Sequence, residues 1–205
     1  MPRLVLASRS PRRHVLLKHL VPDFDVAPAD VEEIAPRGLP VGDAVEVIAA
    51  KKALAVSQKR PGDWVLGADT VVVYHDQLVD KAKDEVDLRS KLAMLSGETH
   101  QVWTGLALAW NGQSVDRRKA VSAVHMDRLP VAVLDTYAAS GQWEGKAGGY
   151  GIQDPLLRPF LHVMSGPWTN VVGLPLAATQ DLLGRNGIPC RPAPQESAVQ
   201  AAGMP

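Results

Sequence analysis

The chain has 205 residues, of which 46% are hydrophobic and 21% are charged, a balance typical of a globular protein. Lys and Arg together number 22, as do Asp and Glu, so the overall charge gives no reason to expect binding to nucleic acid or to a membrane. The sequence has no apolar run of roughly 18 residues and no basic start followed by a long apolar segment, so we expect a cytoplasmic protein without a signal peptide. The single cysteine, Cys190, rules out a disulfide within the chain.

The hydrophobic pattern predicts alternating strands and helices along the chain. In order, these are a strand at residues 3–7, helices at 10–20 and 43–59, a strand at 64–74, a helix at 84–95, a hairpin turning at Asn111-Gly112, a helix at 130–140, a strand at 156–164 and a helix at 175–185. The antiparallel hairpin among βα segments predicts an α/β fold whose mixed, twisted sheet is flanked by helices. We expect a single domain at residues 1–186 and a disordered tail at 187–205, which is rich in Pro, Ala and Gln.

Asp69 is the most unusual residue of the predicted strand at 64–74. Strand alternation places it on one face with Val65, Gly67 and Val71. A carboxylate in such apolar surroundings costs several kcal/mol unless it has a partner. The partner is either a neighbouring loop or a ligand, and Gly67 favours a ligand because we expect it to leave space on the same face.

Basic groups at two places in the sequence predict an anion site. Lys52 lies in the apolar stripe of the helix at 43–59, from which an ammonium either reaches solvent or points at a bound anion. Arg12 and Arg13 lie in the first turn of their helix, where cations typically cost a few tenths to about 1 kcal/mol each. Either both side chains extend into solvent, or they join Ser8 and the backbone N–H groups of that turn in binding a polyphosphate.

The segment GQWEGKAGGYGIQDP, residues 141–155, contains five glycines and permits close approach of the backbone to a ligand. Tyr150, Ile152 and Gln153 within it favour an ordered segment over a flexible surface loop. The Gln153 amide offers a donor beside an acceptor, which suits the edge of a uracil or thymine ring. The same amide could instead fasten the loop to a strand.

The remaining motifs are weak when each is taken alone. The six histidines show no zinc-binding spacing, so a metal here would be a hard cation held by carboxylates and by the substrate. Glu33, in an acidic run, and Lys81, in VDKAKDEVD, are each typical of a solvated surface. No Walker-type glycine loop is present in the sequence.

Taken together, the motifs resemble those of the Maf family of nucleoside triphosphate pyrophosphatases. The resemblance extends from about Leu4 to Leu183 and includes LASRSPRR, VEE, AAKKA, LGADTVV, DK at 80–81, LSGETHQVWTGLAL, KAGGYGIQ and VVGLPL. It implies a fold similar to that of inosine triphosphatases, with a cleft between two lobes, and an assembly that is often a homodimer. It also implies hydrolysis of a nucleoside triphosphate to the monophosphate and pyrophosphate with a divalent cation, Mg²⁺ or Mn²⁺.

Three of these motifs, SPRR, GADT and YGIQ, resemble the subgroup that acts on dTTP and UTP. This resemblance implies that Asp69 accepts a proton in catalysis. The positions that match base-preference residues are Arg12, Thr70 and Gln153. Those that match phosphate-binding residues are Ser8, Arg12, Arg13, Lys52 and Lys81. Glu33 and Asp69 match the metal-binding positions.

Two alternatives stay open at this point. A pyrophosphatase for 7-methyl-GTP or other purine nucleotides is disfavoured by Thr70 and Gln153. A non-catalytic nucleotide-binding regulator of cell division is disfavoured by Asp69, which stands among four basic groups. The chain also has Gly149 where the family usually has alanine, and we expect this glycine only to add flexibility.

Overall fold

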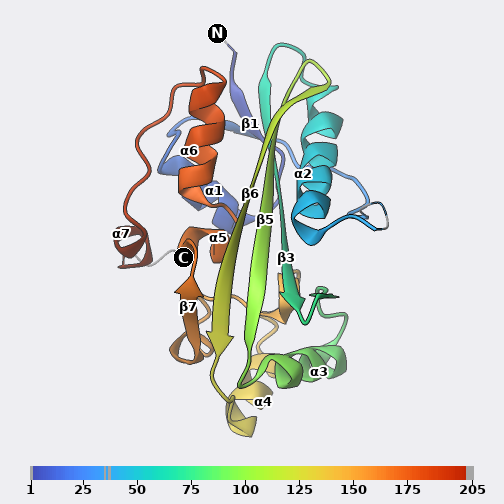
Figure 1. Cartoon of the computed structure of the whole chain (residues 1–205), viewed down its shortest axis with the longest axis vertical. Coiled ribbons are helices and arrows are strands. Elements are labelled where there is room, and N and C mark those ends of the chain that lie inside the picture. The colour runs from blue at the N-terminus through green and yellow to red at the C-terminus, as the bar shows by residue number, and fades with distance from the viewer. Residues whose placement is uncertain (1, 35, 37, 202–205) are drawn as a thin grey trace.

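The computed structural model describes residues 2–34, 36 and 38–201. Its centre is a seven-stranded sheet in the order β2-β1-β3-β5-β6-β7, with β4 paired to β3 (Figure 1). The strands are β1 (Leu4–Leu6), β2 (Asp25–Val26), β3 (Trp64–Tyr74), β4 (Gln77–Val79), β5 (Thr99–Trp110), β6 (Gln113–Met126) and β7 (Leu161–Ser165). β1 runs parallel to β2 and β3, and the other pairs are antiparallel. The predicted mixed α/β sheet is therefore confirmed.

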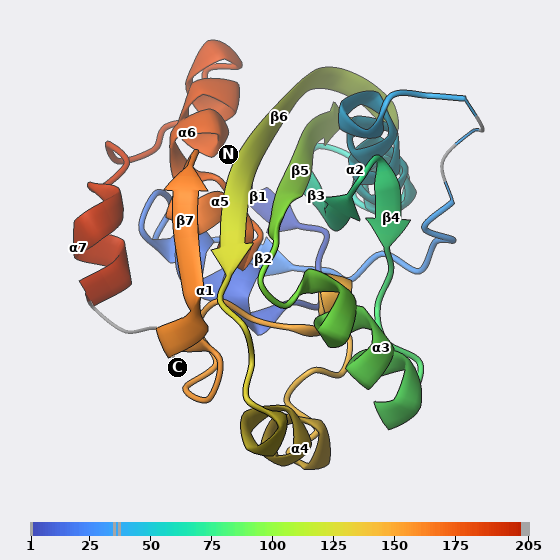
Figure 2. The same ribbon diagram turned by 60° about the horizontal axis from the view of Figure 1, so that its bottom comes forward.

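Helices cover both faces and one end of this sheet. They are α1 (Pro11–Lys18), α2 (Val41–Ser57), α3 (Glu85–Leu95), α4 (Val131–Ala139), α5 (Trp168–Val172), α6 (Leu176–Arg185) and α7 (Glu196–Ala201). Helix α2 packs on one face, α1, α5 and α6 lie on the other, and α3 and α4 lie at the far end (Figures 1 and 2). None of the helices in the described part of the chain combines the length and the apolar character needed to span a bilayer.

The two faces of the sheet hold cores of different size, as the alternation along β5 shows. Leu106 and Leu108 join the large core beneath α1, α5 and α6. Ala107 and Ala109 point the other way, into a small core made largely of alanine and valine from the strands and α2. Small side chains on both surfaces allow α2 to lie unusually close to the strands.

Two glycines bring α2 against the strand backbone. A Cβ on Gly67 of β3 would lie 2.1 Å from the carbonyl oxygen of Ala49, and one on Gly105 of β5 would lie 2.4 Å from that of Val45. The expectation that Gly67 leaves room for a ligand is therefore wrong, because helix α2 fills that space. The close contact instead fixes the position of α2, and of its Lys52, relative to β3.

Residues 187–201 are ordered, which corrects the prediction of a disordered tail for this part of the chain. The Arg191 N–H donates to the carbonyl oxygen of Leu20 at 2.8 Å, and Val199 of α7 is buried in the large core. The composition suggested disorder because the tail cannot build a core of its own, but it packs on one that the domain already provides. Residues 202–205 of the predicted tail lie outside the described residues.

Candidate active site

A cavity of about 410 Å³ lies where the β1–α1 turn, α2, β3 and residues 144–153 come together. All the polar residues assigned roles from the sequence line this one cavity: Ser8, Arg12, Arg13, Glu33, Lys52, Asp69, Thr70, Lys81 and Gln153. Arg9 and Glu144, which sequence reasoning missed, line it as well. Five cationic and three anionic side chains therefore surround the space, and their net positive charge suits a polyanion.

Asp69 and Lys52 form a buried ion pair in the cavity wall. The Lys52 Nζ lies 2.7 Å from Asp69 Oδ1, and the two side chains are 10% and 8% exposed. Asp69 comes from the middle of β3 and Lys52 from the middle of α2. The partner of the buried carboxylate is therefore the ammonium on the helix that packs over its strand, rather than a neighbouring loop.

Glu33 extends this pair into a chain of alternating charges. Its Oε1 lies 2.7 Å from Lys52 Nζ, and its Oε2 accepts a hydrogen bond from Lys81 Nζ at 2.7 Å. Desolvation alone would raise the pKa of Glu33, but the hydrogen bonds from Lys52 and Lys81 outweigh it and lower the pKa to about 2. Glu33 and Lys81 are thus tied into the cavity rather than being isolated surface charges.

Arg13 is bound on several sides by the protein itself. Its Nε donates to the carbonyl oxygen of Gly173 at 2.9 Å, and its Nη1 donates to the carbonyl oxygen of Ala68 at 2.9 Å and to Ser8 Oγ at 3.2 Å. Its Nη2 donates to Thr70 Oγ1 at 2.9 Å. Desolvation lowers the pKa of Arg13. Because these bonds use four of its five N–H donors, Arg13 presents the cavity mainly with a fixed positive charge.

Arg12 differs from its neighbour in having no hydrogen-bond partner among the described residues. Its side chain is half-buried in the cavity wall, and desolvation lowers its pKa against the opposing effect of Asp154 and Tyr137. The solvent-splayed alternative therefore does not hold for either arginine. The guanidinium donors of Arg12 are free to bind an incoming anion or base.

The other two base-preference positions also differ from one another. The Thr70 hydroxyl accepts a bond from Arg13 and lies 2.9 Å from Thr104 Oγ1, so the protein already engages it. The Gln153 amide lines the cavity and makes no hydrogen bond to the described part of the chain. Gln153 and Arg12 therefore have side chains that can contact a ligand directly, whereas Thr70 holds Arg13.

Residues that sequence reasoning did not select build the wall opposite the strands. Asp154 is buried, and its Oδ2 accepts bonds from the Tyr137 hydroxyl at 2.7 Å and the Gly151 N–H at 2.8 Å. Its Oδ1 accepts a bond from Lys146 Nζ. In sequence, an aspartate before a proline is indistinguishable from an ordinary turn residue, so no local signal identified Asp154.

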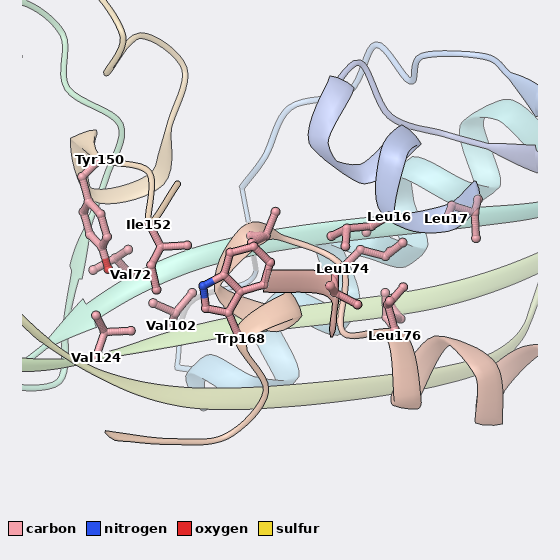
Figure 3. Packing of buried hydrophobic residues seen from close by; sticks show 14 of the residues in the cluster. Leu16, Leu17, Val72, Val102, Val124, Tyr150, Ile152, Trp168, Leu174 and Leu176 are labelled. Atoms are coloured by element: carbon pink, nitrogen blue, oxygen red, sulfur yellow. The ribbon is translucent and has the colours of Figure 1, made fainter. Parts of the chain in front are cut away.

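The same wall is anchored by two apolar side chains. Tyr150 and Ile152 point into the large core beside Val72 and Val102 (Figure 3), and each is 5% exposed. Gly149 has a φ of 75°, and a Cβ there would lie 2.6 Å from Leu88 Cδ1. The expectation that Gly149 only adds flexibility is therefore wrong, because both its backbone angle and its surroundings favour glycine. The wall is an ordered segment, as predicted.

The carboxylates of Glu33 and Asp69 fit a divalent cation. Both contact the single Lys52 ammonium, so they converge on one positive charge at the edge of the cavity. Mg²⁺ usually takes one or two protein carboxylates and completes its shell with water and substrate phosphates. No group of three or more His, Cys, Asp or Glu side chains suited to a metal occurs among the described residues. Phosphate oxygens and water would therefore supply the other ligands.

Comparison with known proteins agrees with the sequence motifs. The model of the family described as Maf-like protein matches residues 3–186. A dTTP/UTP pyrophosphatase of Paramagnetospirillum magneticum is 44% identical over 186 residues, which cover 89% of this chain and 96% of the relative. The protein of that name from Caulobacter vibrioides is 43% identical over 193 residues, covering 93% and 98%. That from Anaeromyxobacter dehalogenans is 44% identical over 191 residues, covering 92% and 96%.

Proposed function

The chain belongs to the family of Maf-like proteins, and from this membership and its cavity we infer that it hydrolyses dTTP and UTP to the nucleoside monophosphate and pyrophosphate. The observation that carries the inference is the convergence of the buried Asp69–Lys52 pair, two arginines and Lys81 on one cavity. A triphosphate needs such a cationic wall, and hydrolysis needs a carboxylate beside it.

In the reaction that we propose, a water molecule attacks the α-phosphorus. A bond forms between the water oxygen and this phosphorus, and the bond from phosphorus to the oxygen that bridges to the β-phosphate breaks. Asp69 accepts the proton of the attacking water, and pyrophosphate leaves with the electron pair of the broken bond. Lys52 orients the Asp69 carboxylate, because its Nζ donates a hydrogen bond to Asp69 Oδ1.

The cationic side chains neutralise charge as pyrophosphate departs. Arg13 and Lys52 contribute from fixed positions, and Arg12 and Lys81 from the more open part of the wall. Glu33 and Asp69 would hold a Mg²⁺ or Mn²⁺ ion, which supplies further charge neutralisation and a more acidic bound water. Ser8, whose hydroxyl bonds to Arg13, lies where it can contact a phosphate oxygen.

Base preference, in this proposal, comes from Gln153 and Arg12. The Gln153 amide can pair with the alternating carbonyl and N–H groups of uracil or thymine. Thr70 contributes to base preference only indirectly, because its hydroxyl accepts a hydrogen bond from the Arg13 guanidinium. The homodimer and the cytoplasmic location implied by the resemblance stay predictions.

Product analysis tests the proposal. The purified chain is incubated with dTTP, UTP, GTP and ATP in the presence of Mg²⁺ or Mn²⁺, and pyrophosphate and orthophosphate are measured separately. We expect pyrophosphate and the monophosphate from dTTP and UTP. Direct release of orthophosphate would rule out attack at the α-phosphorus.

The same panel addresses the alternatives. Preferential hydrolysis of 7-methyl-GTP would indicate a purine enzyme, although the three relatives named above are dTTP/UTP pyrophosphatases by name. Binding of dTTP without any release of pyrophosphate would indicate a non-catalytic regulator.

A further inference from the structure

The C-terminal tail carries a carboxylate that bonds to the helix beside Arg13. Glu196, the first residue of α7, accepts a hydrogen bond from the backbone N–H of Thr169 at 2.8 Å through Oε2. Its Oε1 accepts a second bond from the Thr169 hydroxyl at 2.7 Å. Thr169 lies in α5 and is completely buried. Glu196 lies beyond residues 3–186, the part of the chain that matches the family, so none of the family's motifs includes it.

Thr169 in turn organises the backbone that follows α5. Its carbonyl oxygen accepts bonds from the N–H groups of Gly173 at 3.1 Å and Leu174 at 3.0 Å. Its Oγ1 also accepts a bond from the Leu176 N–H at 3.2 Å. Gly173 has a φ of 120°, which an L-amino acid side chain rarely permits, and its carbonyl oxygen accepts the Nε bond of Arg13. A continuous set of hydrogen bonds therefore leads from Glu196 to Arg13.

We propose that Glu196 is a positioning residue for the phosphate-binding cavity, which holds the Arg13 guanidinium in place through Thr169 and Gly173. The Nε bond to Gly173 fixes one edge of the guanidinium, and the bonds to Ala68, Ser8 and Thr70 fix the other. Removing the Glu196 carboxylate leaves the two Thr169 donors unpaired, so the turn at Gly173 shifts and the Arg13 charge moves with it. The effect on catalysis rests on the proposed function, whereas the effect on phosphate binding does not.

A double-mutant cycle tests whether Glu196 acts through Arg13. Wild type, Glu196→Ala, Arg13→Lys and the double variant are compared by the calorimetric Kd for inorganic pyrophosphate and by kcat/KM for dTTP. Lysine keeps the positive charge but has no Nε–H edge for Gly173 to orient. We expect Glu196→Ala to weaken both quantities about fivefold in the wild-type background and less than about twofold in the Arg13→Lys background. A merely structural role would produce the same loss in both backgrounds.

Two further variants separate positioning from loss of folding. Gln200→Ala, at an exposed position of the same helix, should match wild type in both measurements. Glu196→Gln keeps an acceptor for the Thr169 N–H, so it should recover part of the loss and should fold if Glu196→Ala does not. Thermal unfolding curves verify that each protein is folded at the assay temperature.

The outcomes distinguish this inference from the proposed function. Glu196→Ala with both quantities within twofold of wild type, or additive losses in the cycle, would overturn the inference. A wild-type chain that binds no pyrophosphate would overturn it too, since Arg13 would then serve no phosphate site. If pyrophosphate binding shows the coupling but dTTP is not hydrolysed, the proposed function fails and the positioning role stands.

Discussion

At the residue scale, Asp69 and Lys52 depend on one another. Each side chain alone would be a buried charge, and removing one partner of such a pair typically costs about 3–5 kcal/mol. Their contact at 2.7 Å therefore compensates each charge for its burial and orients the carboxylate. Glu33 shares the same ammonium, which keeps a second carboxylate at the edge of the cavity.

The Asp69→Asn variant tests the role of the carboxylate. The amide preserves size but cannot accept a proton from water, so we expect kcat for dTTP to fall by about 10²–10⁴-fold. The Kd for pyrophosphate should change far less, because the arginines and Lys81 remain. Stopped-assay kinetics and calorimetry give the two quantities. Activity close to that of wild type would remove Asp69 from the reaction.

Gln153→Leu tests base recognition. Loss of the amide should lower kcat/KM for dTTP about tenfold, the worth of one or two neutral hydrogen bonds. The substitution should change kcat/KM for GTP little, so the ratio of kcat/KM for dTTP to that for GTP should fall. Gln142→Leu is the matched control, since Gln142 is exposed in the same glycine-rich segment and does not line the cavity. An unchanged ratio of the two kcat/KM values in Gln153→Leu would show that other groups read the base.

At the element scale, the contact of α2 with the sheet tolerates no side chain at Gly67 or Gly105. Gly105→Ala would place a Cβ 2.3 Å from the carbonyl carbon of Val45 and force α2 away from β5. We expect a loss of at least about 1–3 kcal/mol in the free energy of unfolding, measured by urea denaturation. Gly184→Ala in α6 is the control. Apart from its chain neighbours and the backbone of its own helix, no atom of the described residues lies within 4 Å of a Cβ at that position, and alanine favours a helix by up to about 1 kcal/mol. Equal stability of the Gly105→Ala variant and wild type would contradict this account of the packing.

The sequence predicted long elements better than short ones. The strand at 64–74 appears with its predicted bounds and the hairpin turns at Asn111-Gly112 as predicted, because a long apolar run and a strong turn pair specify them locally. The short β2, β4 and α5 were missed, since tertiary contacts rather than local pattern stabilise them. The strand predicted at 156–164 is β7 at Leu161–Ser165, and a 3₁₀ turn occupies Arg158–Phe160.

The candidate site was likewise predicted in part, with most of the cavity-lining residues found and the residues behind them missed. The motifs selected most of the charged and polar residues that line the cavity, though not Arg9 or Glu144, because charged or polar groups in apolar or glycine-rich surroundings stand out in a sequence. They did not indicate the support behind it, because the partner of Glu196 is distant along the chain and the nearer partners of Asp154 follow no recognisable motif. The use of Gly67 was misjudged because an absent side chain can make room for a helix as well as for a ligand.

At the scale of the whole molecule, stability should depend on pH through His100. The ring is buried, its Nε2 bonds to the Tyr150 hydroxyl, and desolvation lowers its pKa from 6.5 to about 4. The unfolded chain therefore binds this proton more readily than the folded one between pH 6.5 and pH 4. The contribution of His100 to stability is fully present above pH 6.5 and is lost progressively as the pH falls towards 4.

Urea unfolding at pH 7 and at pH 5 measures this effect. We expect wild type to lose about 2 kcal/mol from this group over that interval. His100→Asn, which has no titrating ring, should lose correspondingly less between the two pH values, whatever its stability at pH 7. Parallel pH dependence in the two proteins would show that other groups are responsible.

The close packing of α2 on the sheet at Gly67 and Gly105 also has a consequence for turnover. Because no side chain separates α2 from the strand backbone at Gly67 and Gly105, we expect the helix and the sheet to move as a single block, with Lys52 on the helix and Asp69 on strand β3. In the proposed reaction, we therefore expect the distance between the Asp69 carboxylate and the Lys52 ammonium to stay constant while nucleotides enter and products leave. The two side chains proposed to contact the base directly, Gln153 of the facing segment at residues 144–153 and Arg12 of α1, lie outside this block. If the proposed roles hold, substitutions at Gln153 should change base preference without moving the Asp69 carboxylate.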